Sequence, residues 1–429
     1  MNVALLVVVV LSLLVAGIAR RRNLPAPLLL TVVGLGASLV PGLGGVQLEP
    51  DLVLFVVLPP LLYSAALTSS YVAIKDNVRP IAQLAVVLPL ITTVAVAGVA
   101  WLVLPQLPFT AALVLGAVVA PPDAVSATAI GRRLGLPRRI MTLLGGESLL
   151  NDATALTAYR VALAVAIGTG ASIWSGLWTF TVAAVVGVAM GLAVGLVVDI
   201  VRRRLADAVL ESAVGLVVPF LTYFAAEQLE GSGVLAVVVA GLYLGSRSSR
   251  AGYASRLQDE AVWKAVDVIL ESFVFLLIGL QLRSILDGLA GRSVGSLVLA
   301  SVAVLAAVVV VRLLWVFGSV YLTYALSSRA RKQEGLPPVG GLFVVAWAGM
   351  RGVVSLAAAF AIPLTTATGA DFPGRAEILL LTFVAVVGTL LLHGLTLPWV
   401  IRRLGVQGDA EQRADAVATA AAQHEAGMA

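Results

Sequence analysis

The sequence contains no cysteine, only two histidines and few charged residues. Without cysteine, the 429-residue chain has no disulfide, no thiolate metal site and no cysteine nucleophile. His393 and His424 are too few for a metal centre built from imidazole groups. Charged residues make up 12% of the chain and hydrophobic residues 60%, with a mean hydropathy of +1.03. Soluble domains do not have this composition, so the sequence predicts a protein of the lipid bilayer with no cofactor and no nucleic-acid partner.

Apolar segments long enough, or nearly long enough, to cross about 30 Å of hydrocarbon recur along the chain. Together they predict an all-α polytopic membrane protein with about thirteen transmembrane helices in a membrane domain that covers residues 1–403. The segments are residues 2–19, 25–40, 49–67, 80–104, 107–131, 139–167, 176–200, 208–229, 232–246, 262–284, 294–325, 339–366 and 376–401. Residues 404–429 are predicted to form a short cytoplasmic tail.

Lysine and arginine divide unevenly between the two alternate sets of loops that connect these segments. One set holds twenty of them, whereas the other holds only Arg283, Arg292 and Arg375. Short cytoplasmic loops are rich in Lys and Arg, so this division supports thirteen crossings. It predicts a plasma-membrane protein with its N-terminus outside and its C-terminus in the cytoplasm.

An odd number of helices permits two inverted repeats joined by one linking helix. We expect the repeats to span about residues 1–168 and 207–403, with the linking helix at about 176–200. Corresponding segments of the two repeats, 107–131 and 339–366, both carry helix-breaking residues at mid-membrane. Paired interruptions of this kind are typical of the binding sites of secondary transporters.

Both predicted breaks include a charged residue. The first reads Ala120-Pro121-Pro122-Asp123 and the second reads Gly349-Met350-Arg351-Gly352. Proline has no backbone N–H, so the first break leaves carbonyl groups, including that of Pro122, to face a cavity.

Charged residues at membrane depth each need a partner or a function, because an isolated charge there costs roughly 2.5–3.5 kcal/mol. Those predicted at depth are Asp123, Glu147, Asp152, Arg160, Asp267, Glu271, Arg312 and Arg351. We expect Arg351 to neutralise Glu147. Arg160 and Arg312 are expected to be paired structural charges or to extend toward the membrane surface.

The densest polar cluster lies in the first half of segment 139–167. Helical spacing puts Ser148 one turn before Asp152, and Glu147 one turn before Asn151. With Asp123, these side chains offer the oxygen ligands that a hard cation such as Na⁺ prefers. A carboxylate removed from water also binds a proton more tightly, so a proton and a cation are expected to compete for the same oxygens.

Four motifs give the chain a resemblance to the cation:proton antiporter superfamily, in the branch of NhaP-like and NHE-type sodium/proton exchangers. The motifs are Pro121-Pro122-Asp123-Ala124-Val125, Gly146-Glu147-Ser148-Leu149-Leu150-Asn151-Asp152, Phe275-Leu276-Leu277-Ile278-Gly279-Leu280 and Gly349-Met350-Arg351-Gly352. The resemblance extends to about Arg403 and implies an NhaA/NhaP-like fold with a dimerisation domain, a six-helix core and assembly as a homodimer. The core, or transport domain, would include segments 107–131, 139–167, 339–366 and 376–401.

The resemblance also implies roles for single residues. Those implied in ion binding are Asp123, Ser148, Asn151 and Asp152, with Pro122 in place of a threonine found in some members. Asp152 would bind Na⁺ and a proton in alternation, with Asp123 and Ser148 as further Na⁺ ligands. Glu147 and Arg351 would form a buried ion pair, and Asn151 is typical of electroneutral exchangers. The third segment lacks an acidic residue that some members carry after Pro59-Pro60.

The sequence thus predicts a secondary transporter, not an enzyme, that exchanges Na⁺ for H⁺ one for one by alternating access. If Glu147 and Arg351 cancel, Asp123 and Asp152 carry two negative charges, and either ion reduces that charge equally. Exchange of K⁺ or of monovalent cations broadly for H⁺ is an alternative, because two carboxylates do not fix the ion size. A cation channel is a more distant alternative, since inverted repeats favour alternating access.

Overall fold

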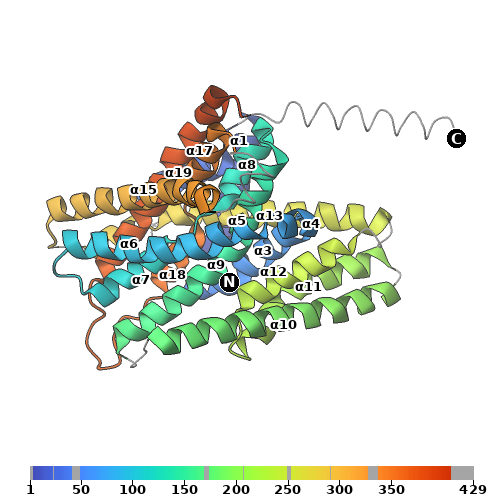
Figure 1. Ribbon diagram of the computed structural model, residues 1–429, viewed down its shortest axis with the longest axis horizontal. Coiled ribbons are helices and arrows are strands. Elements are labelled where there is room, and N and C mark those ends of the chain that lie inside the picture. The colour runs from blue at the N-terminus through green and yellow to red at the C-terminus, as the bar shows by residue number, and fades with distance from the viewer. Residues whose placement is uncertain are drawn as a thin grey trace.

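A computed structural model describes residues 3–22, 24–40, 49–168, 173–205, 207–248, 253–289, 291–326 and 337–406. Most of these residues are helical (Figure 1). Across the described ranges the only extended pairing is an isolated bridge between Thr365 and Asp371. The predicted tail lies outside these residues beyond position 406. The all-α prediction is confirmed.

Every predicted apolar segment corresponds to a helix or to consecutive helices. In the first part of the chain these are α1 (Val3–Arg21), α2 (Ala26–Ser38), η1 (Leu52–Val57), α3 (Leu58–Thr68), α4 (Tyr71–Asp76), α5 (Val78–Ala82), η2 (Gln83–Val87), α6 (Leu88–Val103), α7 (Phe109–Val119), α8 (Ala124–Leu134) and α9 (Arg138–Ile167). The later helices are α10 (Ile173–Leu205), α11 (Ala208–Glu227), α12 (Gly233–Ser246), α13 (Tyr253–Leu280), α14 (Leu282–Asp287), α15 (Val294–Leu326), α17 (Val339–Trp347), α18 (Val353–Phe360) and α19 (Arg375–Leu404).

By length and composition, six helical stretches within the described residues can each cross a membrane alone. They are residues 78–103, 178–205, 208–227, 255–287, 294–326 and 375–404. Segment 139–167 is a single 30-residue helix outside these six, and the other predicted segments are shorter helices or consecutive helices. The number of thirteen crossings therefore stays a prediction.

Local sequence sets the ends of several helices. Pro108, Pro137 and Pro338 each directly precede a helix, where a missing N–H costs nothing. Asp207 caps α11, because its Oδ1 accepts hydrogen bonds from two N–H groups of the first turn. Gly168 ends α9 at a φ of 87°, a left-handed conformation that glycine adopts without strain.

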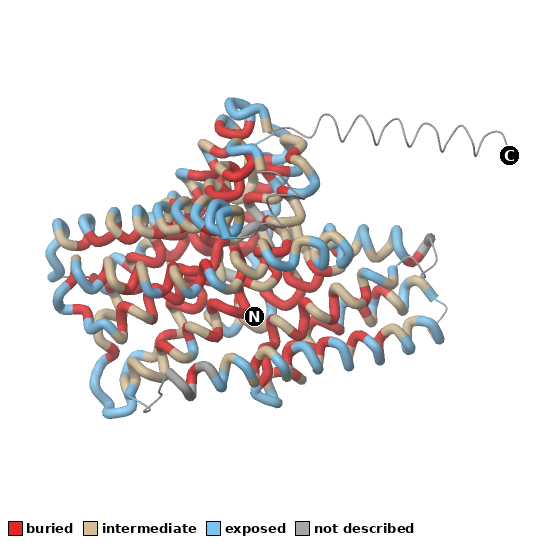
Figure 2. Tube along the Cα trace, viewed as in Figure 1, coloured by how far each residue is buried: buried red, intermediate tan, exposed pale blue. Residues whose placement is uncertain are grey.

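Two groups of buried hydrophobic side chains hold the helices together, and the exposed residues follow the outer faces (Figure 2). The larger group contains side chains from α2, α6, α7, α13, α15, α17, α18 and α19. The smaller group contains side chains from α3, α11 and α12 and a few from α9 and α10. Large apolar side chains such as Trp178 and Leu196 on α10 remain exposed, as expected for a surface in contact with lipid.

The two predicted interruptions are present, and they meet. Residues 120–123 separate α7 from α8, and residues 348–352 separate α17 from α18. The backbone N–H of Asp123 in the first break donates a 2.6 Å hydrogen bond to the carbonyl oxygen of Met350 in the second. Each break therefore supplies a hydrogen-bond partner to a backbone group of the other. Irregular backbone at membrane depth requires such partners.

Candidate functional site

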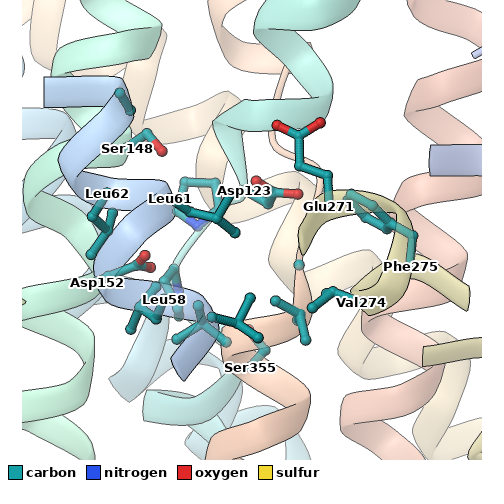
Figure 3. Close-up of a pocket in the computed structure, with 17 residues that line it drawn as sticks. Leu58, Leu61, Leu62, Asp123, Ser148, Asp152, Glu271, Val274, Phe275 and Ser355 are labelled. Atoms are coloured by element: carbon teal, nitrogen blue, oxygen red, sulfur yellow. The ribbon is translucent and has the colours of Figure 1, made fainter. Parts of the chain in front are cut away.

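A cavity of about 60 Å³ lies beside the point where the breaks meet. A buried water needs roughly 10–15 Å³ by this measure, so the pocket has room for an ion with a few waters. Its walls come from η1, α3, the first break, α9, α13 and the start of α18 (Figure 3). Its polar side chains are those of Asp123, Ser148, Asp152, Glu271 and Ser355.

Helix α9 brings Ser148 and Asp152 to the pocket on one face, as their spacing of four residues predicts. Asp152 is only 8% exposed, whereas Ser148 is half-buried. Asp123 enters from the end of the first break, where it is half-buried. The three residues expected to bind Na⁺ thus line one cavity.

Asn151 has a different place from the other predicted ion-binding residues. Its side chain is fully buried, and its amide donates a 2.6 Å hydrogen bond to the carbonyl oxygen of Pro122. Asn151 does not line the pocket. It therefore connects α9 to the first break and fixes the Pro122 carbonyl, which sequence reasoning had left unpaired.

The predicted partner of Glu147 is wrong. Glu147, 1% exposed, forms a two-pronged ion pair with Arg312 of α15, not with Arg351. Arg312 Nη2 lies 2.8 Å from Glu147 Oε2, and Arg312 Nη1 bonds Glu147 Oε1. Arg312 also donates to the carbonyl oxygens of Val345 and Ala346, the last turn of α17 before the second break.

The geometry of Arg312 explains this correction. A guanidinium group carries five donors in a planar fork, so it can satisfy a carboxylate and two carbonyl groups together. Arg312 sits near the middle of the 33-residue helix α15, too far from either end to extend to the membrane surface. It is 2% exposed and is therefore a paired structural charge.

Arg351 is buried within its own break. Its side chain donates a 3.3 Å bond to the carbonyl oxygen of Gly349, and its backbone N–H donates to Thr389 Oγ1. Its Nε atom has no hydrogen-bond partner in the part of the chain that the structure describes. The guanidinium thus adds a buried positive charge behind the break instead of cancelling Glu147.

Two half-buried acidic residues on α13 lie on the same side of the molecule as the pocket or line it. Glu271 lines it, and Asp267, one turn earlier, accepts a 2.7 Å hydrogen bond from Ser64 of α3. Ser64 stands in the third apolar segment, which has no acidic residue after Pro59-Pro60. The acidic side chains on this side of the pocket therefore come from α13.

Ser355 is the pocket residue that sequence reasoning missed. It lies on α18, four residues after Arg351, and is 1% exposed. The available signal was its position directly after a predicted break, within one turn of a charged residue.

The chain is similar in sequence to known membrane exchangers. Residues 8–403 match the sequence pattern of a protein family whose description reads "Sodium/hydrogen exchanger, transmembrane". An uncharacterised Na⁺/H⁺ exchanger of Mycobacterium tuberculosis is 35% identical over 392 residues, which cover 90% of this chain and 71% of the relative. The Na⁺/H⁺ antiporter ApNhaP of Aphanothece halophytica is 33% identical, over 91% of this chain and 72% of its own.

A solved structure has the same fold. The sodium proton antiporter MjNhaP1 of Methanocaldococcus jannaschii superposes with a TM-score of 0.71, over 93% of this chain and 97% of its own. The two sequences are 20% identical. The predicted fold class is confirmed by this likeness.

Proposed function

The chain belongs to the family of transmembrane sodium/hydrogen exchangers, and on this premise we propose that it exchanges Na⁺ for H⁺ across a membrane through the pocket beside Asp123 and Asp152. The relatives named as Na⁺/H⁺ exchangers support this activity, and the likeness of the fold supports the same architecture. The protein is a transporter and not an enzyme.

One observation carries the assignment of the site. Asp152 is nearly removed from water yet faces a cavity that also contains Asp123 and Ser148. Water no longer stabilises such a carboxylate, so a bound proton or a bound cation must do so. Both bind the same oxygens, so the arrival of one favours the release of the other.

The charges around the pocket support one-for-one exchange. Arg312 pairs with Glu147, so these two charges cancel. Asp123 and Asp152 then carry two negative charges, which one Na⁺ or one proton reduces to one. The two loaded states would have equal charge, so a complete cycle would move no net charge.

The two hydrophobic groups support alternating access. Leu58 and Leu62 on α3 belong to the smaller group, whereas Val274 and Phe275 on α13 belong to the larger one. All four line the pocket, which therefore lies where the groups meet. Movement of one group against the other would open the pocket to each side in turn.

The remaining features of the proposal rest on the predictions made from the sequence. We assign the protein to the plasma membrane as a homodimer, with its N-terminus outside and its C-terminus in the cytoplasm. The repeats would be residues 1–168 and 207–403, joined by α10, and each would contribute one broken helix to the site. No cofactor is expected.

Proteoliposomes containing the purified protein and a pH-sensitive dye test the activity. A Na⁺ gradient should drive proton movement, and Asp152→Asn should abolish it, because an amide does not exchange a proton for Na⁺. Asp287→Asn, the same change at an exposed residue outside the pocket, should leave the rate unchanged. Full transport by Asp152→Asn would refute the assignment. A rate that depends on membrane potential would contradict one-for-one exchange.

K⁺ is a second candidate for the transported cation. The pocket volume of about 60 Å³ has room for an ion with a few waters, so its size alone does not exclude K⁺. Exchange rates for Li⁺, Na⁺, K⁺ and Rb⁺ at equal concentration decide between a Na⁺ exchanger and a broad monovalent-cation exchanger. Unitary currents in a planar bilayer would instead support a channel.

A further inference from the structure

Ser355 lines the pocket, and its hydroxyl group has no hydrogen-bond partner among the described residues. Its side chain is 1% exposed, and its Oγ atom has no hydrogen bond to any residue within the described ranges. Figure 3 includes it among the side chains around the cavity, on the wall formed by α18. A buried hydroxyl group without a partner is unfavourable, so its presence here needs an explanation.

The break in the helix explains why this hydroxyl is unpaired. Buried Ser and Thr residues in helices usually bond a carbonyl three or four residues earlier, as Thr157 and Thr389 do here. For Ser355, those positions are Gly352 and Arg351, which lie in the second break and have no helical geometry. The hydroxyl is thereby left available to the cavity.

The other oxygen-bearing side chains of the pocket come from α9, from the first break and, with Glu271, from α13. Ser148 and Asp152 project from α9, and Asp123 projects from the first break. A small cation binds best when oxygen atoms surround it. Ser355 is a hydroxyl on the second break's side of the same cavity.

We propose that the Ser355 hydroxyl oxygen is a ligand of the transported cation, which completes from α18 the oxygen set that Asp123, Ser148 and Asp152 provide. This inference rests on the proposed function. It makes the cation site a product of both broken helices. It also gives a chemical reason for a buried polar atom that the protein itself does not pair.

Ser355→Ala tests the proposal by separating binding from stability. We expect the KM for Na⁺ to rise about 3- to 10-fold, the effect of losing one uncharged ligand. The melting temperature of the purified variant without Na⁺ should be unchanged or higher, because an unpaired polar group is removed. The rise in melting temperature on adding Na⁺ should be smaller than in the unmodified protein.

Ser38→Ala is the matched control. Ser38 is fully buried, but its hydroxyl bonds the carbonyl of Leu35 within α2 and lies outside the pocket. This variant should keep the KM for Na⁺. An unchanged KM in Ser355→Ala, with transport by the unmodified protein intact, would overturn the inference and leave the proposed function standing. Absence of Na⁺-driven exchange in the unmodified protein would instead overturn the proposed function.

Ser355→Cys provides a second test that does not depend on transport. The chain has no cysteine, so this thiol is the sole target for a small, water-soluble methanethiosulfonate reagent. Na⁺ should slow its labelling relative to an equal concentration of choline, because a bound cation covers the position. Equal labelling rates in Na⁺ and choline would contradict a role for Ser355 as a ligand.

Discussion

Replacing Arg312 by methionine should destabilise the protein more than any other single removal of a buried charge at the site. The change leaves Glu147 as a buried carboxylate without its ion-pair partner, and it removes donors from two carbonyl groups at the end of α17. Breaking a buried pair on one side costs about 3–5 kcal/mol. Total stabilities are about 5–15 kcal/mol, so this loss is a large part of the whole.

Denaturation in detergent, followed by tryptophan fluorescence, measures this loss. A change of 3–5 kcal/mol corresponds to about a 10²- to 10⁴-fold change in the folded-to-unfolded ratio. Glu147→Leu combined with Arg312→Met should recover most of the stability, because no unpaired carboxylate remains.

Arg351→Met is the control for this experiment. Arg351 is equally buried, but its side chain makes one long hydrogen bond and no ion pair within the described residues. Its replacement should cost less than about 1.5 kcal/mol. If Arg351→Met destabilised the protein more than Arg312→Met, the reasoning from the observed pair would be refuted.

Three further substitutions or conditions test the site. Gly352→Ala should raise the KM for Na⁺ several-fold, because its Cβ would lie 2.6 Å from Asp123 Cβ. Gly145→Ala, whose Cβ would meet open space, should leave the KM unchanged in the same transport assay. Asn151→Asp should lower the melting temperature, because a carboxylate cannot donate to the Pro122 carbonyl as the amide does; an unchanged value would argue against that bond. Lowering the pH by one unit in the acidic range should raise the KM for Na⁺ by up to about tenfold, because protons and Na⁺ compete for Asp152. A pH-independent KM in initial-rate measurements would exclude a shared site.

The broken helices were predictable because their signal is local. Pro121 and Pro122 cannot continue a hydrogen-bonded helix, and Gly349 and Gly352 allow the chain to leave one. Helical spacing likewise predicted that Ser148 and Asp152 share a face. In each case the relevant residues lie within one or two turns of each other.

The partner of Glu147 was not predictable in this way. The chain has two arginines, Arg312 and Arg351, at depths from which either can reach a carboxylate on α9. The choice depends on how α15 packs against α17, over a sequence separation of 165 residues between Glu147 and Arg312. Ser355 was missed for a related reason, since a serine becomes notable only when its usual carbonyl partners are known to be absent.

The bond between the two breaks has a consequence for biosynthesis. Met350 follows Asp123 by 227 residues, so a ribosome that adds 5–20 residues per second needs about 10–45 s to make the second break after the first. Throughout that interval the N–H of Asp123 has no Met350 carbonyl to bind. Assembly of the site must therefore follow translation of almost the entire chain, and a nascent protein truncated before α17 carries a permanently incomplete first break.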